Sequence, residues 1–473
     1  MSDRPRPRHP ALAALLSFLF PGLGQAYYGQ RRLAAVLAAP VVLLALLAAL
    51  LATLFADAIR NDLLSAAFLS AAVVVDVALM GWRLFAIGQV GFARPRGAAT
   101  IGLVVVLLMT TVAMHAWAGV VVARLNTTLD DVFSGSGRGA PVAGVPGGGP
   151  LNRPDYRWDG TGRINFLLLG VDAGPGREEA LTDTILAVSV DPVARTAVMI
   201  SVPRDTGYLP LPDRSIYPDG VFPKKINELA TEASLSPDLW CPDLPKTSAA
   251  ACGLRTLERA IGLYLGMTIQ YYAQVDLQGF AQMIDAVGGV SLCLPGKMVD
   301  PEYGGPTWEG VGIELPAGCT HYDGVHALAF ARIRKGWIDL PDGTRDDQND
   351  FKRAERQQQV LLELRREFAT ADVIFELPRL LEAVGATVST DFPRSKAGDL
   401  ASLLPLITGP DIERAVLGYP DFVDAPIDPD VNYLLIPRRD DVRAGIQQLF
   451  GADAVLEGWY LGSEADGPPT TEA

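Results

Sequence analysis

Three long apolar stretches near the N-terminus constrain the fold of this chain more than any other feature. They cover residues 33–56, 63–82 and 99–123, and each holds about 20 or more residues, the length needed to cross ~30 Å of hydrocarbon. We therefore predict three membrane-spanning helices within a membrane region at residues 1–123. An earlier apolar segment is too short to cross and leads into a proline and several glycines, so we expect residues 11–28 to be re-entrant or interfacial.

The arginines predict which way this region points, because cytoplasmic loops carry an excess of Lys and Arg. With three crossings, one side receives the arginines that precede the first span and those between the second and third spans. These are Arg4, Arg6, Arg8, Arg31, Arg32, Arg83, Arg94 and Arg96. The loop between the first two spans is net negative, with Asp57, Arg60 and Asp62. We therefore expect a multi-pass membrane protein whose C-terminal part lies outside the cytoplasm.

The charge of the whole chain argues against a nucleic-acid partner. Its 473 residues carry a formal net charge of −14, whereas phosphate backbones are bound mainly by excess Lys and Arg. Only four histidines are present, so zinc sites rich in histidine and Ser-His-Asp triads have few candidates. Carboxylate, arginine and metal chemistry remain.

All four cysteines lie in the later, polar part of the chain. They are Cys241, Cys252, Cys293 and Cys319. An even number confined to one region favours disulfides in an oxidising compartment. Sequence order favours Cys241 with Cys252 and Cys293 with Cys319, although three pairings are possible. The alternative is four buried free thiols.

Beyond the membrane region the chain divides into a tether and a folded domain. Residues 124–162 are rich in Gly, Pro and Ser and predict a flexible linker. Short apolar runs bounded by turn residues then alternate with helical stretches, as in the strand at 271–275 followed by a helix over 277–287, which is typical of an α/β layer domain. We assign this domain to residues 163–455 and expect residues 456–473 to be a disordered tail.

Two aspartates flank neighbouring predicted strands. Asp172 follows the strand that ends at Gly170, and Asp183 precedes the strand that starts at Thr184, so a short excursion could bring both carboxylates to one sheet edge. One or two carboxylates completed by water and substrate phosphates are the ligands that Mg²⁺ prefers. The alternative, which spacing alone leaves equally open, is that both residues only shape turns.

Arginines gather at the ends of other predicted elements. Arg204 follows a strand, Arg332 and Arg334 end a helical stretch, and Arg353 and Arg356 lie three residues apart on one helix face. Guanidinium groups bind phosphate oxygens with two parallel hydrogen bonds, which a pyrophosphate ester would need. The alternative for residues 346–356 is a solvated helix face with ion pairs.

The order of the longer motifs resembles that of the LytR-CpsA-Psr family, over a region from about Arg163 to Phe450. The motifs that carry the resemblance are NFLLLGVD (165–172), TDT (182–184), SVPRDT (201–206), KIN (225–227), YYAQVDLQGF (271–280), IDAVGGV (284–290), DGVHALAFARIR (323–334) and DFKRAERQQQVL (350–361). Several long motifs in one order are far more specific than any single one.

The resemblance implies a layered α/β fold with a central mixed sheet and a transferase in a bacterial cell membrane. Such an enzyme moves a glycopolymer from a polyprenyl-pyrophosphate carrier to peptidoglycan and forms a phosphodiester. Its implied partners are this lipid-linked glycan, peptidoglycan and the membrane. The alternatives are a polyprenyl-pyrophosphate hydrolase and a protein that binds the polyprenyl lipid without catalysis.

The same resemblance implies roles for individual residues. Asp172 and Asp183 match the metal-binding aspartates, which implies Mg²⁺ or Mn²⁺ as cofactor. The residues that match the pyrophosphate-binding set are Arg204, Arg332, Arg334, Arg353, Arg356 and Gln357. Among these, Arg204, Arg332 and Arg334 are catalytic candidates, together with Asp205, a weak candidate for the base because an Arg-paired carboxylate holds protons poorly.

Two positions depart from the family pattern. Members often carry Arg shortly after the first aspartate and again just before the second, whereas this chain has Ala173-Gly174 and Leu181-Thr182. Arg177 could compensate for the missing charge. If it does not, weaker activity or a pure binding role becomes plausible.

Overall fold

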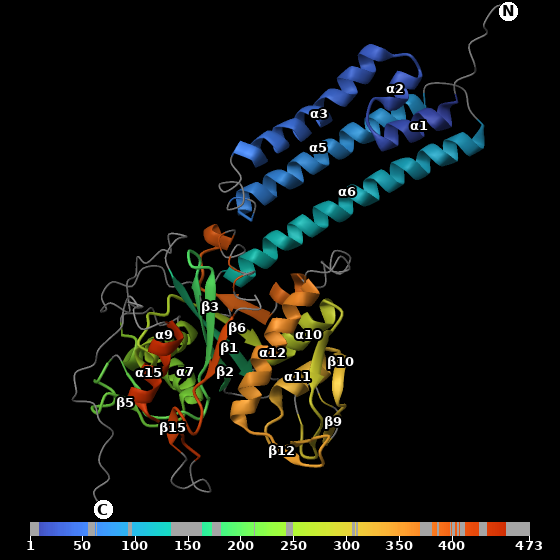
Figure 1. Ribbon diagram of the computed structural model, residues 1–473. Coiled ribbons are helices and arrows are strands. Elements are labelled where there is room, and N and C mark those ends of the chain that lie inside the picture. The colour runs from blue at the N-terminus through green and yellow to red at the C-terminus, as the bar shows by residue number, and fades with distance from the viewer. Residues whose placement is uncertain are drawn as a thin grey trace, which may run out of the picture. The chain divides into compact units, whose positions relative to one another are not determined.

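The structure is a computed structural model in which most of the chain is described. The described residues are 9–54, 62, 64–92, 97–133, 163–172, 181–211, 213–242, 249–304, 308, 311–368, 381–385, 387–397, 399, 403, 406, 412–424 and 433–450, without the side chains of 52, 172, 365, 368 and 395. The chain forms two compact units (Figure 1). Unit 1 comprises residues 1–129 and 394–399, and unit 2 comprises the rest.

Unit 1 is built from apolar helices. They are α1 (Pro10–Leu19), α2 (Leu23–Tyr27), α3 (Arg31–Leu54), α5 (Ala66–Gly91) and α6 (Ala98–Phe133). In the described part of the chain, α3, α5 and α6 are the three helices long and apolar enough to cross a membrane. Helix α6 continues to Phe133, so the expected linker does not begin at residue 124. The remainder of that linker, residues 134–162, and the expected tail at 456–473 lie outside the described residues.

The segment predicted to be re-entrant or interfacial folds back on itself. Helix α1 has only 10 residues and is followed by Gly22, whose φ of +102° is a conformation that favours glycine. A Cβ atom on Gly24 would lie 2.1 Å from the backbone oxygen of Ala13, so α2 approaches α1 more closely than a larger residue allows. The buried Gln25 donates to the backbone oxygen of Ala86 on α5 at 2.9 Å. The glycines of this segment therefore permit the turn, and Gln25 attaches it to α5.

Unit 2 contains a central sheet of six strands in the order β13-β6-β1-β2-β3-β14. The strands are β1 (Ile164–Asp172), β2 (Leu181–Asp191), β3 (Thr196–Ser201), β6 (Tyr271–Asp276), β13 (Val388–Thr390) and β14 (Glu413–Val416). Strand β1 pairs parallel to β6 and β3 pairs parallel to β14, while the other neighbours are antiparallel. The predicted α/β class with a central mixed sheet is confirmed.

Helices cover both faces of this sheet (Figure 1). Successive residues of a strand point to opposite faces, and on β2 the side chain of Ile185 packs in one core while that of Leu186 packs in another. The first core includes residues of α7 (Ile226–Leu235), α9 (Ala249–Leu265) and α15 (Arg439–Phe450). On the other side lie α10 (Leu277–Ala286), α11 (Gly324–Arg332) and α12 (Asp350–Phe368). Both sides of the sheet are thus buried against amphipathic helices.

A further core lies under α11 and α12, against strands outside the central sheet. These strands are β7 (Val290–Leu294) paired with β10 (Gly318–Tyr322), and β12 (Arg345–Asp347), β11 (Trp337–Asp339), β8 (Lys297–Asp300) and β9 (Ile313–Leu315) in that order. The remaining short elements of the unit are β4 (Leu209–Pro210), β5 (Val221–Phe222), α8 (Pro237–Trp240), β15 (Val423–Asp424) and β16 (Ile436–Pro437). A 3₁₀ turn, η1, covers Arg394–Lys396.

Two disulfides join the four cysteines in the pairing that sequence order favours. Cys241 is bonded to Cys252 at the start of α9, and Cys293 of β7 is bonded to Cys319, its partner across the pair of strands. Both bonds lie in unit 2. The alternative of four free thiols is wrong in this structure.

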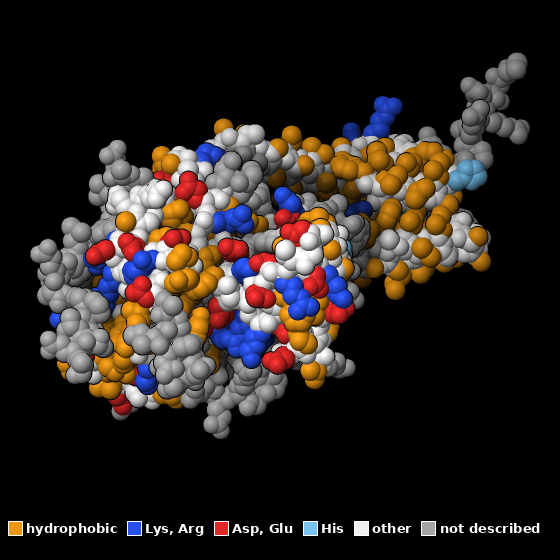
Figure 2. All heavy atoms as spheres, turned by 60° about the horizontal axis from the view of Figure 1, so that its bottom comes forward, with side chains coloured by type: hydrophobic (Ala, Val, Ile, Leu, Met, Phe, Trp, Pro, Cys, Tyr) orange, Lys and Arg blue, Asp and Glu red, His pale blue; other side chains and the backbone are white. Residues whose placement is uncertain are grey.

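The two units differ in their surfaces. Most of the exposed large hydrophobic side chains belong to α3, α5 and α6, which lipid would solvate. Figure 2 shows the contrast, because orange side chains dominate the helices of unit 1, whereas acidic and basic side chains are interspersed on the described part of unit 2. Unit 1 therefore has the surface of a membrane segment, and unit 2 has that of a water-exposed domain.

Candidate functional site

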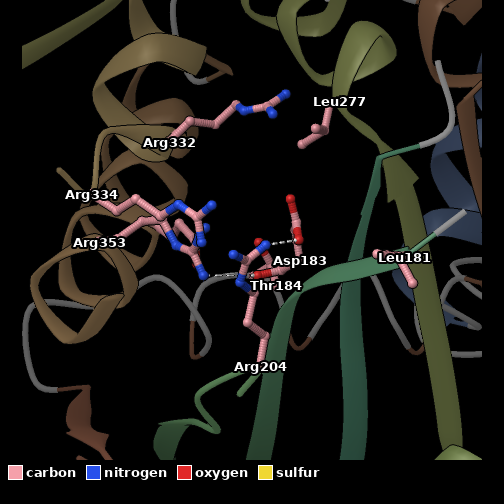
Figure 3. Close-up of a pocket in the computed structure, with 9 residues that line it drawn as sticks. Leu181, Asp183, Thr184, Arg204, Leu277, Arg332, Arg334 and Arg353 are labelled. Atoms are coloured by element: carbon pink, nitrogen blue, oxygen red, sulfur yellow. Dashed lines mark hydrogen bonds and ion pairs between the residues drawn. The ribbon is translucent and has the colours of Figure 1, made fainter. Parts of the chain in front are cut away.

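A polar pocket in unit 2 collects side chains from several elements of the sheet and its helices. Its lining residues are Leu181, Asp183 and Thr184 of β2, Arg204, Leu277 of α10, Arg332, Arg334, and Arg353 and Gln357 of α12. Four of these are arginines and one is a carboxylate. Strand β2 supplies one wall, and the ends of α11 and α12 supply another (Figure 3).

A β-bulge directs Asp183 into this pocket. Gly170 of β1 pairs with Thr184, but its neighbour Val171 pairs with Thr182, so Asp183 is an extra residue in β2. A bulge of this kind changes the direction of a side chain relative to the regular alternation of a strand. One carboxylate oxygen of Asp183 accepts a hydrogen bond of 2.5 Å from Nη1 of Arg204, and the other points into the pocket (Figure 3).

Arg204 is surrounded by carboxylates. Besides its bond to Asp183, its Nε lies 3.8 Å from Oδ2 of Asp205, and Asp350 also acts on it electrostatically. Burial by itself lowers the pKa of Arg204, but the attraction of these carboxylates outweighs it and raises the pKa above its ordinary value. The guanidinium of Arg204 therefore stays charged, in a place where anionic ligands would compete with Asp183 for it.

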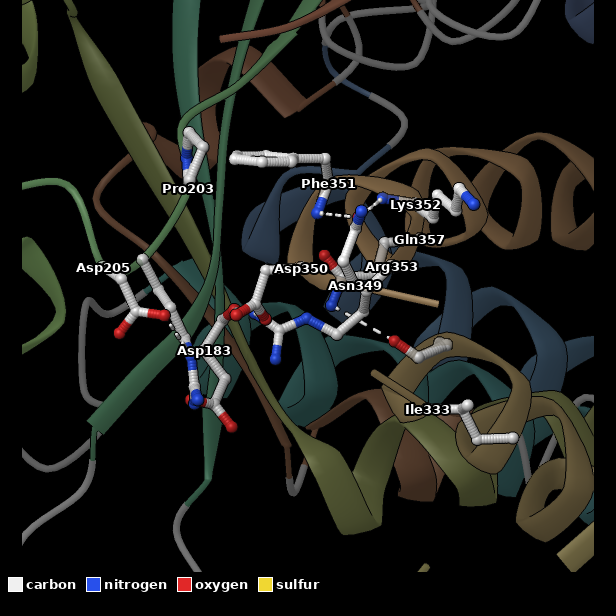
Figure 4. A network of polar contacts seen from close by, with 12 residues as sticks. Asp183, Pro203, Asp205, Ile333, Asn349, Asp350, Phe351, Lys352, Arg353 and Gln357 are labelled. Atoms are coloured by element: carbon white, nitrogen blue, oxygen red, sulfur yellow. Dashed lines mark hydrogen bonds and ion pairs between the residues drawn. The ribbon is translucent and has the colours of Figure 1, made fainter. Parts of the chain in front are cut away.

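The remaining cations come from α12 and from the end of α11. Nη2 of Arg353 lies 2.9 Å from Oδ1 of Asp350 and contacts the backbone oxygen of Asp183 at 3.5 Å (Figure 4). Arg353 is buried, and this burial lowers its pKa. Arg332 and Arg334 extend from the α11 side of the same pocket (Figure 3). The arginines predicted from three separate sequence segments, with the exception of Arg356, are thus brought together.

Arg356, which the resemblance assigned to the pyrophosphate-binding set, contacts other groups of the protein. It does not line the pocket, and its guanidinium donates to the backbone oxygens of Phe330 and Ile333 and to Oε1 of Gln348. Arg356 is buried, so these acceptors replace water. The prediction that Arg356 binds pyrophosphate directly finds no support in this geometry. Its neighbour Gln357 does line the pocket.

Asp205 also lies behind the lining of the pocket. Its Oδ1 receives an ion pair of 2.8 Å from Nζ of Lys225, and its side chain is 5 % exposed. Burial and the nearby carboxylate of Asp350 raise the pKa of Asp205, partly offset by Lys225 and Arg204. Its geometry suits support of Arg204 better than contact with a ligand, and its predicted role as a base stays untested.

The predicted metal site is described in part. The backbone of Asp172 ends β1 opposite Leu181, two residues from Asp183 on the neighbouring strand, but the side chain of Asp172 lies outside the described residues. Within the described residues, no group of three or more His, Cys, Asp or Glu side chains converges as a metal site. Asp183 offers a hard carboxylate oxygen directed into the pocket, which fits Mg²⁺ or Mn²⁺. The metal remains a prediction.

Some residues around the site were not predicted as part of it. Leu277 follows Asp276, whose side chain accepts a hydrogen bond from the backbone N–H of Gly279 and so begins α10 directly at the end of β6. The position of Leu277 at a strand end, where ligand crevices form in α/β sheets, was the signal available in the sequence. Lys225 and Asp350 begin two of the motifs that carry the resemblance, and the structure pairs them with Asp205 and Arg353, respectively.

Comparison with protein families decides the identity of the domain. The model of the LytR_cpsA_psr family matches residues 143–421, more than half of the chain. The chain belongs to the LytR-CpsA-Psr family. The resemblance seen in the motifs is thereby confirmed, and the residues of the pocket lie within the matched region.

Two curated relatives of this LytR-CpsA-Psr protein show the range of names in the family. One is the polyisoprenyl-teichoic acid–peptidoglycan teichoic acid transferase TagU of Oceanobacillus iheyensis. The two sequences are 30 % identical over 233 residues, and this matched region covers 49 % of this chain and 60 % of TagU. The other is the regulatory protein MsrR of Staphylococcus aureus. It is 28 % identical to this chain over 236 residues, and this matched region covers 50 % of this chain and 58 % of MsrR. The chain thus spans about 60 % of the length of these relatives.

Solved structures that resemble the chain include B. subtilis TagV. The two are 22 % identical, with a TM-score of 0.43, over 61 % of this chain and 97 % of TagV.

Proposed function

We propose that this protein transfers a glycopolymer from a polyprenyl-pyrophosphate carrier to peptidoglycan. The observation that carries the proposal is the convergence of Arg204, Arg332, Arg334 and Arg353 on one pocket, to whose described lining Asp183 contributes the one carboxylate. A diphosphate diester has two negative charges, which such an excess of guanidinium groups would neutralise through paired hydrogen bonds. The family membership of the chain and the printed activity of its relative TagU support the same reaction.

In the proposed reaction, a hydroxyl oxygen of peptidoglycan attacks the phosphorus that bears the glycan. The bond from that phosphorus to the bridging oxygen breaks, polyprenyl phosphate leaves, and the hydroxyl proton passes to the leaving phosphate or to solvent. Arg332, Arg334 and Arg353 from the wall formed by the ends of α11 and α12, and Arg204 from the side of β2, would hold the diphosphate oxygens and stabilise the charge that develops on them. Phosphoryl transfer depends mainly on this kind of positioning and electrostatic stabilisation.

A divalent cation is part of the proposal. Mg²⁺ or Mn²⁺ held by Asp183, with Asp172 as the predicted second ligand, would supply further positive charge to the phosphate oxygens. Asp183 is suited to this because its carboxylate is directed into the pocket by the bulge in β2.

The proposed location is a bacterial cell membrane with unit 2 on the outer side. Three apolar helices support a multi-pass membrane segment, and two disulfides in unit 2 suit an oxidising compartment. A net charge of −14 makes DNA an unsuitable partner, despite the regulatory name of the relative MsrR.

The test uses the full-length protein in detergent with a lipid-linked glycan and peptidoglycan. We expect polymer-bearing muropeptides by mass spectrometry, and a loss of on the order of a hundredfold or more in rate for Arg204→Ala, because the charged transition state loses a donor. Arg345→Ala is the control, since Arg345 is exposed and stacks on Trp337 outside the pocket. Absence of transfer, or an Arg204→Ala variant as active as wild type, would overturn the proposal.

One observation favours a second candidate, a lipid-binding protein without catalysis. Leu181 lines the pocket at a position where family members often carry Arg, and Leu277 adds a second apolar side chain. A protein of this kind would retain polyprenyl pyrophosphate in stoichiometric amounts and release no polyprenyl phosphate, whereas a hydrolase would release it without peptidoglycan. Product analysis with and without peptidoglycan distinguishes the transferase, the lipid-binding protein and the hydrolase.

A further inference from the structure

Arg356 on α12 makes an unusually complete set of contacts for a residue outside the pocket. Its Nε donates to the backbone oxygen of Phe330 at 2.7 Å, while its two terminal nitrogens donate to the backbone oxygen of Ile333 and to Oε1 of Gln348. The residue is 6 % exposed. Every nitrogen of this guanidinium therefore has an acceptor within unit 2.

Two of these acceptors belong to the end of α11. The last carbonyl groups of a helix have no partner within it, and they need donors from elsewhere. Helix α11 ends at Arg332, so the carbonyls of Phe330 and Ile333 lie at this end, and Gln357 donates to the carbonyl between them, that of Ala331, at 3.3 Å. A cation at a helix C-terminus is also favoured by the helix dipole. Arg356 thus caps α11 from a neighbouring helix.

The capped segment carries the two arginines of one pocket wall. Arg332 is the last residue of α11, Ile333 follows it, and Arg334 is next. Bonds to the carbonyls of Phe330 and Ile333 restrict the backbone on both sides of Arg332 and immediately before Arg334. The side chains of these two arginines start from this backbone and reach the pocket.

We propose that Arg356 is a positioning residue, which fixes the end of α11 so that Arg332 and Arg334 present their guanidinium groups to the pyrophosphate. This inference rests on the proposed function, because it concerns the same pocket. It assigns to Arg356 a role distinct from that of Arg353, one turn earlier on α12, which lines the pocket itself.

The geometry requires arginine at this position. A guanidinium group has a planar fork of donors that can reach three acceptors in fixed directions, whereas the ammonium group of lysine is a compact point charge. Burial, followed by repulsion from Arg353, lowers the pKa of Arg356 to about 10, so the group remains protonated at neutral pH and keeps all of its donors. Lysine would keep the charge but leave part of the end of α11 without donors.

The first experiment measures binding of inorganic pyrophosphate to the full-length protein by titration calorimetry. For Arg356→Lys and Arg356→Ala we expect affinity weaker by on the order of tenfold, because small displacements of positioned groups cost this much or more. The matched control is Arg366→Ala on the same helix, where the side chain is 74 % exposed and pairs with Glu363. The control should bind as wild type does.

A double-mutant comparison separates positioning from direct binding. In a protein that already carries Arg332→Ala and Arg334→Ala, the further change Arg356→Ala should leave pyrophosphate affinity almost unaltered, since its effect passes through these two residues. A further loss of about tenfold in that background would mean that Arg356 acts on the ligand independently, and it would overturn the proposal.

Folding and the proposed function have their own readouts. Thermal unfolding followed by tryptophan fluorescence reports whether each variant folds, and Gln348→Ala, which removes one acceptor of Arg356, serves as a milder variant with a smaller expected loss of affinity. If wild type does not bind pyrophosphate, the proposed function fails. If wild type binds and the folded Arg356 and Gln348 variants bind equally well, the positioning role alone fails.

Discussion

At the scale of single residues, the contact between Arg204 and Asp183 is one that ligands of the pocket would have to break. The 2.5 Å bond occupies a guanidinium that would bind phosphate and a carboxylate that would bind a cation. A cation at Asp183 would weaken this bond and leave Arg204 available to an anion. Cation and diphosphate should therefore bind more tightly together than separately, by reciprocal linkage.

Asp183→Asn tests this coupling. The asparagine removes a negative charge that competes for Arg204, so we expect the variant to bind inorganic pyrophosphate without Mg²⁺ roughly tenfold more tightly than wild type. Added Mg²⁺ should strengthen binding to wild type but hardly to the variant. Titration calorimetry with and without Mg²⁺ measures both effects.

The control for this change is Asp191→Asn on the same strand, where the carboxylate pairs with Arg163 at 3.1 Å outside the pocket. It should keep the Mg²⁺ dependence of wild type. Weaker binding by Asp183→Asn in the absence of Mg²⁺ would show that Arg204 is not held back by Asp183.

The limits of sequence reasoning are visible in these same residues. Strand ends suggested Asp183 and Arg204, a helix end suggested Arg332, and spacing on a helix face suggested Arg353. Turns and a solvated helix face remained open as alternatives, and the resemblance to the family favoured a binding site. The bulge that turns Asp183 was not predictable, since a single extra residue leaves no period in the sequence. Nor was the role of Arg356, because the spacing along a helix gives its face but not the element that covers that face.

At the scale of elements, close contact between α10 and the first residue of α11 fixes the position of α11. A Cβ atom on Gly324 would lie 2.0 Å from the backbone oxygen of Ala281, and a shift of α11 would be needed to relieve it. Such a shift would carry Arg332 with it. Gly324 is not among the glycines with a positive φ, so backbone conformation does not require glycine here. The close packing against α10 requires it.

Gly324→Ala should accordingly lower the free energy of unfolding by about 1 to 3 kcal/mol, the usual cost of overpacking a rigid contact. Chemical denaturation of the full-length protein, followed by tryptophan fluorescence, measures the change. Gly304→Ala is the matched control, because no atom of the described residues lies within 4 Å of a Cβ atom there, and it should change stability by less than about 0.5 kcal/mol. Equal stabilities of the two variants would contradict the packing argument.

Sequence patterns predicted individual elements better than their assembly. The strand and helix expected at 271–275 and 277–287 are observed as β6 and α10, almost residue for residue. The following strand, β7, pairs with β10 and takes no part in the central sheet. Alternating apolar residues give a strand its faces, but its partner depends on distant segments, so this second, smaller layer was not predictable.

At the scale of the whole molecule, the disulfides stabilise unit 2 by restricting its unfolded chain. The bond between Cys293 and Cys319 closes a sequence separation of 26 residues, for which the loss of chain entropy corresponds to about 3.5 kcal/mol. Replacing both cysteines by serine should lower the free energy of unfolding by about that amount. Denaturation with and without reductant checks this, since reductant should leave the variant less affected than wild type.

The orientation of the molecule is the remaining prediction, and it follows from the distribution of arginines around three spans. Because all four natural cysteines are disulfide-bonded, a new cysteine at one site can be labelled selectively. Ser215→Cys, exposed in unit 2, should react with a membrane-impermeant maleimide on intact cells, whereas Gly97→Cys, between the second and third spans, should react only after the membrane is permeabilised. Labelling in the reverse order would place unit 2 in the cytoplasm, away from peptidoglycan, and would contradict both the charge argument and the proposed acceptor.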